Sequence, residues 1–535
     1  MSNFWVWFKS LGIAIGSAIA FCGNSAIAQI TQDGTLPTNS QVTPQGNIIN
    51  IEGGTQVGSN LFHSFKEFSV PAGSTANFKN TENIQNIISR VTGKSISDIQ
   101  GIIKAGGTAN LFLINPNGIV FGPNASLQIG GSFLATTASS LNFADGTKFS
   151  ATDPQTTPLL TVSVPIGLQF GATAAPIRNQ SQAPSPDGKT TNVFGKPIGL
   201  QVEPGKTLAL VGGDITLEGG NLTAPSGRIQ LGSVAGNSLV TLNPNNQGWV
   251  LGYEKVQDFQ NIQLIRRRTD DGSQVPSQVD ASNNMGSGGN IQVLARTVLL
   301  SGDGVSLINQ TTGDRDGEDI TITTRKLIVQ DGAQVSTSTL GKGAAGTLSV
   351  NASESVELIG SVTLPTITGF ITLTADQGKA GNIKIDTRRL LIQNGARVIA
   401  DSSGIIVPNS LVIPATGPAG NITINALDSV EITGKSIADK PSVLTAQTFN
   451  FPNGGIVNIT TGQVIVKDEA QITVSVRVPK NQINLEYPSN PGTPGTLNIT
   501  ARSILLDNKG QLTSTTRSGQ GGNINLQVQD FLRMR

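Results

Sequence analysis

The sequence is short of the residues from which disulfide scaffolds and metal sites are usually built. It has one cysteine, Cys22, and one histidine, His63, among 535 residues. A single cysteine excludes an intramolecular disulfide, and a single histidine excludes metal sites that need several imidazoles. His63 is flanked by Phe62 and Phe65, so we expect a packed structural residue rather than a catalytic base. These shortages favour a protein without metal or cofactor.

Charge and bulky side chains are also scarce. Charged residues make up 13% of the chain, and 36 Lys and Arg nearly balance 35 Asp and Glu. A nucleic-acid-binding protein would need a basic face, so this class of partner is disfavoured. Aromatics at 4% and three Met are too few for a conventional globular core of this size, whereas Gly is abundant at 63. This composition suits thin layers of β-branched side chains between turns, and it predicts an all-β protein.

The first 28 residues are typical of a secretory signal peptide rather than of the fold. Lys9 is their only charge, and it is followed by an apolar run over residues 11–21. Residues 26–28 (AIA) fit the small-x-small cleavage rule, which makes Gln29 the expected mature N-terminus. A transmembrane anchor is the weaker alternative, because spanning a bilayer takes roughly 20 apolar residues.

One short phrase recurs through the second half of the chain, and its consensus is small-Gly-Asn-Ile-polar-Ile. Copies occupy residues 289–293, 318–322, 346–350, 381–385, 420–424, 455–459, 495–499 and 522–526. The steps between equivalent apolar positions, counted from Ile291, are 29, 28, 35, 39, 35, 40 and 27 residues. Unequal steps indicate loops of variable length inserted into a constant structural plan.

Each phrase alternates apolar and polar residues, which predicts a strand with one buried face. Short strands joined by Gly, Asn and Asp turns cannot bury that face alone, but stacked coils of a parallel β-helix can. A coil of roughly 20–25 residues predicts on the order of twenty coils and a rod roughly 100 Å long. A set of immunoglobulin-like sandwiches is the alternative, but its strands would recur about every 8–12 residues.

The region before the repeats carries a different set of phrases. They are residues 60–65 (NLFHSF), 68–73 (FSVPAG), 88–93 (ISRVTG), 110–119 (NLFLINPNGI), 121–125 (FGPNA) and 130–136 (GGSFLAT). In this order they resemble the amino-terminal secretion domain of filamentous haemagglutinins and related exoproteins of two-partner secretion. We therefore divide the chain into a signal peptide (1–28), a two-partner secretion domain (29–271) and a β-helical repeat region (272–535).

The resemblance implies a right-handed parallel β-helix, of the architecture also seen in pectin lyases, with an N-terminal capping subdomain. It implies passage through an outer-membrane pore protein whose periplasmic domains bind the secretion domain. The expected location is outside a Gram-negative-type bacterium, secreted or on its surface, reached through the periplasm. The residues that the resemblance assigns to secretion or partner binding are Asn115, Pro116, Asn117, Gly118, Ile119 and Asn124.

The Asn115–Ile119 phrase also has a plain structural interpretation. Pro116 fixes φ for a turn, Gly118 permits a positive φ, and Asn115 can bond to backbone groups at a corner. On this interpretation the phrase is a β-helix corner without which the domain does not fold. The alternative is direct contact with the pore protein, and the sequence leaves both open. A second Asn-Pro-Asn, at residues 243–245, lies outside the dense resemblance and is expected to be a turn.

Two charged clusters are expected to be surface loops. The acidic run at residues 314–319 could hold calcium but lacks a full loop of ligands, so we expect an exposed turn between coils. The arginines at residues 266–268 are followed by Asp270 and Asp271, which offset their charge at the domain junction. With the acidic residues otherwise scattered, the sequence favours a non-enzymatic protein.

The favoured function is an adhesin-like rod that contacts a cell surface or an extracellular polysaccharide. A toxin or cytolysin shaft is the alternative, but it would need a distinct carboxy-terminal domain. A β-helical polysaccharide lyase is less favoured. The chain stops soon after the phrase at residues 522–526, so we expect a product truncated at its C-terminus.

Overall fold

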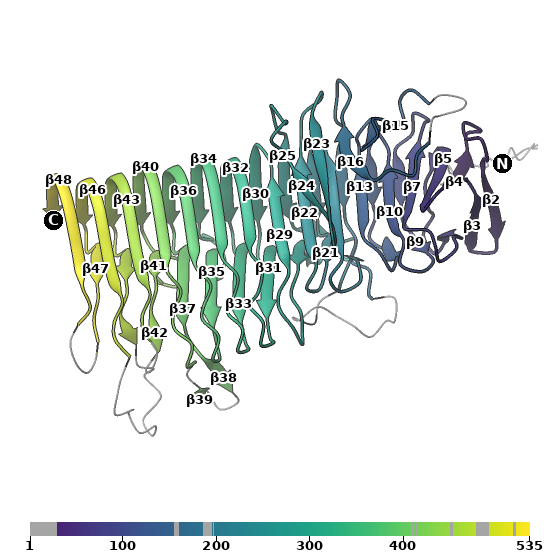
Figure 1. Ribbon diagram of the computed structural model, residues 1–535. Helices are drawn as coiled ribbons and strands as arrows, with labels where there is room; N and C mark the ends of the chain where they lie inside the picture. Colours follow the sequence, from purple (N-terminus) through teal and green to yellow (C-terminus); the bar gives the residue numbers. More distant parts are fainter. Residues whose placement is uncertain are drawn as a thin grey trace, which may run out of the picture.

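The computed structural model describes residues 29–154, 160–185, 195, 197–407, 411–413, 415–449, 453–477, 492–516 and 521–535. The expected signal peptide, residues 1–28, lies outside them. Within these ranges the chain forms strands and turns and no helix. Accordingly, the described residues include no helix that is long and apolar enough to span a bilayer. Coils stack along one axis into a rod, with the N-terminal strands at one end and the last strand at the other (Figure 1).

The first face of the rod is a stack of parallel strands in which each coil contributes one strand. In the described part of the chain this stack has fourteen levels. The strands are β5 (Asn60–Phe68), β7 (Asn86–Val91), β10 (Asn110–Ile114), β13 (Phe133–Thr136), β19 (Thr207–Gly212), β22 (Arg228–Ser233), β29 (Asn290–Leu294), β32 (Ile320–Gln330), β34 (Leu348–Ile359), β36 (Ile383–Gln393), β40 (Ile422–Thr433), β43 (Ile456–Lys467), β46 (Thr496–Asp507) and β48 (Ile524–Met534).

The second face changes character along the rod. Near the N-terminus it has strands of its own, namely β8 (Ser97–Ile99), β11 (Ile119–Phe121), β17 (Ile177–Asn179), β20 (Ile215–Glu218), β25 (Asn261–Ile265) and β30 (Thr297–Ser301). From β32 onward the first and second faces are two halves of one strand of 11 or 12 residues. Most pairings of these long strands shift register at the junction of the halves, between Thr324 and Lys326 for example.

The third face is formed by two successive parallel stacks. The first contains β3 (Ile48–Gly53), β6 (Thr75–Phe78), β9 (Ile102–Ala105) and β12 (Ser126–Gln128). The second contains β18 (Leu200–Gln201), β21 (Asn221–Thr223), β28 (Gln278–Asp280), β31 (Ser306–Thr311), β33 (Gln334–Thr339), β35 (Gly369–Thr374), β37 (Arg397–Ser402), β41 (Val443–Thr445), β42 (Thr448–Phe449), β44 (Gln471–Thr473), β45 (Val476–Arg477) and β47 (Gln511–Thr513).

Antiparallel strands close the N-terminal end and cover one side of the rod. The cap consists of β1 (Ile30–Gln32), β2 (Ser40–Gln45) and β4 (Thr55–Val57), which pair with β5 or β3. The side sheet contains β14 (Ser140–Phe143), β15 (Lys148–Ser150), β16 (Pro165–Gln169), β23 (Leu239–Asn245) and β24 (Gly248–Gly252). Two small hairpins project elsewhere, β26 (Arg267–Arg268) with β27 (Gln274–Val275) and β38 (Ile405–Val407) with β39 (Leu411–Ile413).

The recurring phrase marks successive levels of the first face. Ile291 lies over Ile320, and each later apolar position of the phrase pairs with the next, ending with Leu497 over Ile524. From Ile291 to Leu497 these side chains are fully buried in one continuous core. The predicted fold is confirmed, because alternation along the strand and stacking across coils select the same residues.

The glycine of the phrase is required by the close approach of successive coils. A Cβ on Gly381 would collide with the carbonyl oxygen of Gly346, and one on Gly420 would collide with that of Gly381. The same holds for Gly455 over Gly420 and for Gly495 over Gly455. The phrase therefore keeps glycine because any side chain here would push two coils apart.

Where the phrase carries asparagine at residues 382 and 421, its side chain bonds to the backbone of the next coil. Asn382 Oδ1 accepts a hydrogen bond from the backbone N–H of Asn421 at 3.0 Å. Asn421 Oδ1 in turn accepts one from Ile456 N–H at 2.9 Å. Each amide thus satisfies a backbone donor that the next turn would otherwise leave unpaired.

The predicted number of coils was too high. The step from Leu208 to Ile229 takes 21 residues, but the step from Val457 to Leu497 takes 40. The step from Phe133 to Leu208 takes 75, because the chain leaves the coil to build part of the side sheet. Fourteen levels span about 60 Å at one strand spacing per level. Composition could not reveal how many residues lie outside the stack.

Candidate functional site

The predicted site begins at a corner between β10 and β11. Asn115 is completely buried there. Its amide nitrogen donates to the carbonyl oxygen of Ser95 at 3.1 Å and to Ser97 Oγ at 2.9 Å. Its Oδ1 accepts from the backbone and side-chain N–H groups of Asn117 at 3.0 and 2.9 Å. The side chain is saturated by contacts within the protein, so the folded domain offers none of it to a partner.

The neighbouring residues shape the turn. Gly118 has φ of 123°, a region that favours glycine, and its N–H donates to the carbonyl of Asn115 at 3.2 Å. Asn117 Nδ2 donates to Gly93 O in the coil below at 2.8 Å. Ile119 is buried and lies between Ser97 and Ile177 on the second face. The corner therefore ties three levels together, as the turn interpretation of this phrase expects.

The six predicted residues do not form one exposed surface. Asn115, Gly118 and Ile119 are buried, whereas Pro116 and Asn117 are partly exposed. Asn124 is exposed on the next turn, between β11 and β12. The asparagine does not repeat up the stack, because the next level carries threonines at 136 and 137. Of the six, only Asn124 is exposed.

Sequence reasoning missed a buried arginine on the neighbouring strand. Arg90 on β7 is 1% exposed and donates to Ser64 Oγ, to the Ser150 carbonyl and to Thr35 Oγ1 at 2.8, 2.6 and 2.8 Å. Its guanidinium carbon lies 4.2 Å from the ring centroid of Phe149. One side chain therefore joins the cap, the first face and the side sheet. The available signal was a lone charge inside the apolar phrase at residues 88–93.

Arg90 remains charged in this position. Burial lowers its pKa to about 10, while the carboxylate of Asp33 acts in the opposite direction. Asp33 accepts hydrogen bonds from Ser64 Oγ at 2.6 Å and Thr92 Oγ1 at 2.7 Å. Burial raises the pKa of Asp33, but these bonds and those from Thr35 outweigh it and leave the pKa below its usual value. Ser64 and Thr35 each accept a hydrogen bond from Arg90 and donate one to Asp33, so two hydroxyls link the opposite charges within the cap.

His63 is a packed residue, as expected. It is completely buried, its ring stands 5.3 Å from that of Phe78, and Nδ1 lies 3.0 Å from Ser40 Oγ. Burial lowers its pKa to about 3, so the ring is neutral at physiological pH. A neutral, enclosed imidazole is part of the cap rather than a solvent-facing base.

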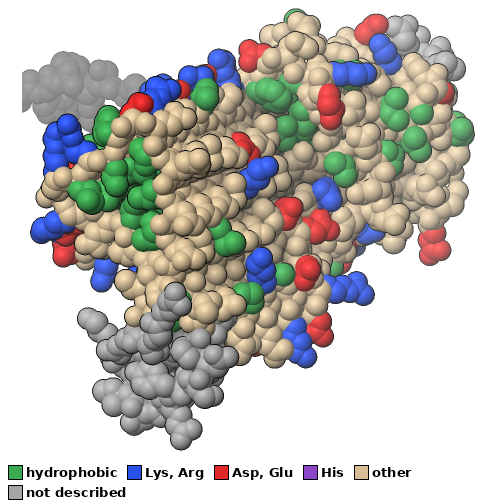
Figure 2. Space-filling view, turned by 60° about the vertical axis from the view of Figure 1, so that its left-hand side comes forward, with side chains coloured by type: hydrophobic (Ala, Val, Ile, Leu, Met, Phe, Trp, Pro, Cys, Tyr) green, Lys and Arg blue, Asp and Glu red, His purple; other side chains and the backbone are tan. Residues whose placement is uncertain are grey.

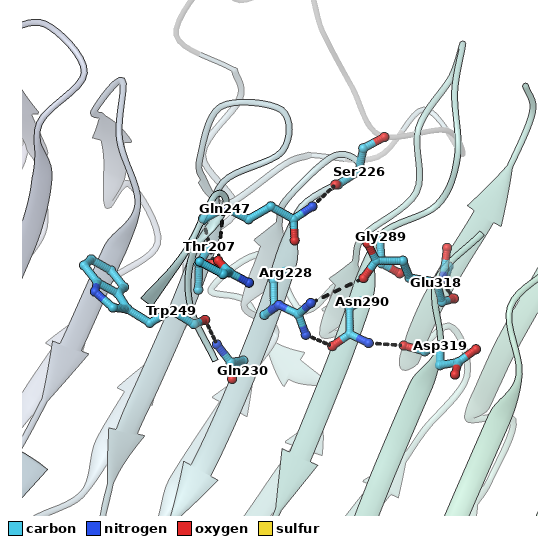
Figure 3. A network of polar contacts seen from close by, with 12 residues as sticks. Thr207, Ser226, Arg228, Gln230, Gln247, Trp249, Gly289, Asn290, Glu318 and Asp319 are labelled. Atoms are coloured by element: carbon cyan, nitrogen blue, oxygen red, sulfur yellow. Dashed lines mark hydrogen bonds and ion pairs between the residues drawn. The ribbon is translucent and has the colours of Figure 1, made fainter. Parts of the chain in front are cut away.

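The side sheet is fastened to the rod by a buried glutamine (Figure 3). Gln230 on β22 donates to the carbonyl of Trp249 at 2.7 Å and accepts from Leu251 N–H at 2.8 Å. Its amide thereby pairs with β24 as a neighbouring strand would. At the hairpin tip, Ser132 and Thr207 each donate to the carbonyl of Gln247 at 2.9 Å. The second Asn-Pro-Asn, residues 243–245, was expected to be a turn, but it forms the end of strand β23, and the turn follows at residues 246–247.

Polar contacts also join strand β22 to the repeat region, through Arg228 (Figure 3). Arg228 on β22 donates to Asn290 Oδ1 at 2.7 Å and pairs with Glu318 at 3.4 Å. Asn290 Nδ2 donates onward to Asp319 O at 3.1 Å. The stack therefore passes through the expected domain boundary near residue 271 without a break in its ladders.

The two charged clusters lie in turns. Asp316 and Asp319 accept hydrogen bonds from the backbone N–H groups of Ala344 and Thr347 in the next coil, at 2.8 and 2.7 Å. The arginine run ends in the small β26–β27 hairpin at the surface. Among the described residues, no three His, Cys, Asp or Glu side chains gather as metal ligands. Charges of both signs are distributed over the face in Figure 2.

Comparison with known proteins agrees with this architecture. Residues 28–293 match the family model of the TPS secretion domain. The crystal structure of the HMW1 secretion domain from Haemophilus influenzae is similar at a TM-score of 0.50 and 15% identity, covering 93% of this chain and 100% of that chain. A filamentous hemagglutinin secretion domain aligns at a TM-score of 0.27 and 16% identity, over 64% of this chain and 99% of that chain. At that score the second alignment carries no structural argument. None of the curated proteins matches the sequence.

The family match and the stacked coils support each other. The TPS secretion domain covers the cap, the side sheet and the Asn115 corner, and secretion domains of this kind are right-handed β-helices. Such a domain implies a partner transporter in the outer membrane. The chain therefore belongs to the two-partner-secreted exoproteins of the filamentous haemagglutinin type, with the secretion domain in its N-terminal part.

Proposed function

We propose that this chain is exported by its N-terminal signal peptide, crosses the outer membrane through a dedicated pore protein, and works outside as a non-enzymatic adhesive rod. The match of residues 28–293 to the secretion domain carries this proposal. The rod offers stacked, outward-facing strand surfaces with few charges, which suits contact with other surfaces better than catalysis. We infer periplasmic binding domains on the pore protein from the same resemblance.

Within this function, we assign the Asn115–Ile119 phrase to folding of the secretion domain. The burial of Asn115 and its four hydrogen bonds support this role. Removing the amide would leave the Ser95 carbonyl and the Asn117 N–H unpaired, and each buried group left unsatisfied costs about 1–3 kcal/mol. Exposed Asn124 is the better candidate for contact with the pore protein.

The experiment compares Asn115→Ala with Asn124→Ala in the chain that starts at Gln29. Folding is followed by the fluorescence of Trp249, which is then the only tryptophan. Binding to the purified periplasmic domains of the pore protein, and secretion from cells, are measured in parallel. We expect Asn115→Ala to unfold at a lower urea concentration and to be secreted poorly. Asn124→Ala should fold normally and bind the periplasmic domains more weakly.

A normally folded Asn115→Ala variant that no longer binds the periplasmic domains would show that the phrase contacts the partner directly. Secretion that is independent of any pore protein would reject the export route itself. Adhesion is tested separately, by binding of the purified secreted chain to bacterial and host cell surfaces. Absence of binding to every surface would reject the adhesive role.

A further inference from the structure

A groove runs over the outward side of the third face, in the repeat region. It crosses β31, β33 and β35 and has a volume of about 500 Å³. Its floor consists of the outward side chains of these strands, whereas their inward side chains belong to the core. The groove lies far from the Asn115 corner in sequence, and neither the secretion motif nor the cap contributes to it.

The floor is arranged in columns set by the strand register. In one column Ile308 lies beside Ser336, which lies beside Ile371. In the next column Gln310, Ser338 and Leu373 follow one another in the same way. The first column thus alternates aliphatic and polar side chains along the rod axis, and the second has two polar side chains followed by an aliphatic one, with one step for each strand spacing of about 4.8 Å.

The polar groups on this floor are available to a ligand. Gln310 is only 7% exposed, yet its side-chain amide has no hydrogen-bond partner among the described residues. Likewise, in that part of the chain the hydroxyls of Ser336 and Ser338 bond to no protein group. At the groove edge, by contrast, Gln334 Nε2 donates to Ile367 O at 2.9 Å. The Gln310 amide atoms keep some contact with solvent, so they can bond to water or to a ligand in the groove.

The charge and the backbone of the groove restrict what can bind. Its described lining contains one carboxylate, Asp303, and no lysine or arginine. This environment does not favour a polyanion. Each of the three strands is paired on both edges, so an extended peptide could not add to the sheet through its backbone. Binding must rely on side-chain hydroxyls, amides and aliphatic surface.

We propose that this groove binds a neutral linear polysaccharide lying along the rod axis. Ser336, Ser338 and Gln310 would bond to sugar hydroxyls, while Ile308, Ile371 and Leu373 would pack against the apolar faces of the rings. The strand spacing is close to the length of one pyranose ring, so successive sugars meet successive coils. The inference rests on the proposed adhesive function and names the ligand class for it.

The test uses the purified secreted chain in native gels that contain a dissolved polymer. Dextran, hydroxyethylcellulose and galactomannan are the neutral probes, and alginate is the anionic probe. We expect at least one neutral polymer to retard the protein. Gln310→Met and the double change Ser336→Ala with Ser338→Ala should each weaken retardation at least about fivefold, because each removes hydrogen bonds to the ligand. Ser349→Ala, an outward serine on the first face, is the matched control and should change nothing.

Retardation by alginate alone, by no polymer, or equally in groove and control variants would overturn the proposal. Binding to cells is then measured after periodate treatment, which destroys sugar diols, or after protease treatment. Loss with periodate supports a glycan, and loss with protease alone indicates a protein partner and rejects it. If the groove variants still adhere to cells as well as the parent chain does, the proposed polysaccharide site is rejected, but the adhesive function is not. A parent chain that adheres to nothing rejects the adhesive function instead.

Discussion

The secretion domain and the repeat region share one stack but fill it differently. Of ten fully buried phenylalanines in the described residues, nine precede residue 171 and one, Phe370, lies among the repeats. The secretion domain also has a second core between the rod and the side sheet. The repeats instead bury columns of Ile, Val and Leu, with glycine and asparagine ladders between coils. The fold of the secretion domain thus depends on contacts that occur once and join residues distant in sequence. The fold of the repeat region depends on the same contacts made again in each coil.

This difference predicts different responses to mutation. In a stack of similar coils, stability is close to a sum of local terms and nearest-neighbour terms, so damage stays near its source. In the secretion domain, Arg90 bonds to Ser150, which lies 60 positions away in the sequence, and Ser132 bonds to Gln247, which lies 115 positions away. Damage there should spread through the whole domain. Trp249 reports on this domain alone, because no described residue of the repeats is a tryptophan.

The largest effect is expected from Gly455→Val in the glycine ladder. The new side chain would collide with the carbonyl of Gly420, and we expect a loss of about 4 kcal/mol or more. Hydrogen exchange should show β43, β46 and β48 opening, while the fluorescence of Trp249 stays unchanged. Gly434→Ala is the control, since its nearest neighbour atom is 3.8 Å away and only its φ of 73° opposes a side chain. A Gly455→Val protein that is as protected as the parent would refute the ladder.

The next largest effect is expected from Arg90→Met in the secretion domain. The change removes three hydrogen bonds of a buried guanidinium and the charge that acts on Asp33 through the Ser64 and Thr35 hydroxyls, at a cost of about 3–5 kcal/mol. The urea midpoint reported by Trp249 should fall, and secretion should fall with it. Arg178→Met is the matched control, because its pair with Glu218 is largely exposed and worth less than about 1 kcal/mol. Equal midpoints for the two variants would show that Arg90 does not join the cap to the side sheet.

The same contrast explains what could be predicted from the sequence. The repeat levels follow from alternation and spacing, and every step counted from Ile291 is one coil of the structure. The corner at Asn115 follows from local turn chemistry, because its partner Asn117 is two positions away. Local rules therefore sufficed for periodic strands and for the turn.

Contacts between distant residues were not predictable in this way. Nothing in the order of residues indicates that Arg90 donates a hydrogen bond to the Ser150 carbonyl, or that the Gln230 side chain bonds to the backbone of Trp249 as a neighbouring strand would. The number of coils was wrong for the same reason, since residues of the side sheet cannot be separated by composition from residues of the stack. Likewise, the groove over Ile308 and Ser336 depends on which strands become neighbours.

Acid should weaken the secretion domain through His63. Its pKa of about 3 in the folded cap lies below the 6.5 of an exposed histidine, so the unfolded chain takes up a proton more readily. Stability is therefore lost as pH falls below about 6.5, by about 2 kcal/mol between pH 7 and pH 5. Urea unfolding followed by Trp249 at both pH values measures this loss. His63→Asn keeps a polar partner for Ser40 but cannot titrate, so its pH dependence over this range should vanish.

The smallest effect is expected in the repeats, and it has the opposite sign. Burial raises the pKa of Asp401 to about 6, although hydrogen bonds from Gln447 and Thr445 and the charges of Arg477 and Arg397 oppose the shift. The folded state then holds a proton more tightly than the unfolded chain, so lowering the pH from 7 to 5 removes the charge from this partly buried side chain. We expect about 1 kcal/mol of added stability around β37, measured as slower hydrogen exchange. Asp401→Asn should show this protection already at pH 7, because its amide oxygen can accept both hydrogen bonds. If exchange near β37 instead accelerates in acid, as expected for the cap, the carboxylate is not buried, and the two regions respond to pH in the same way.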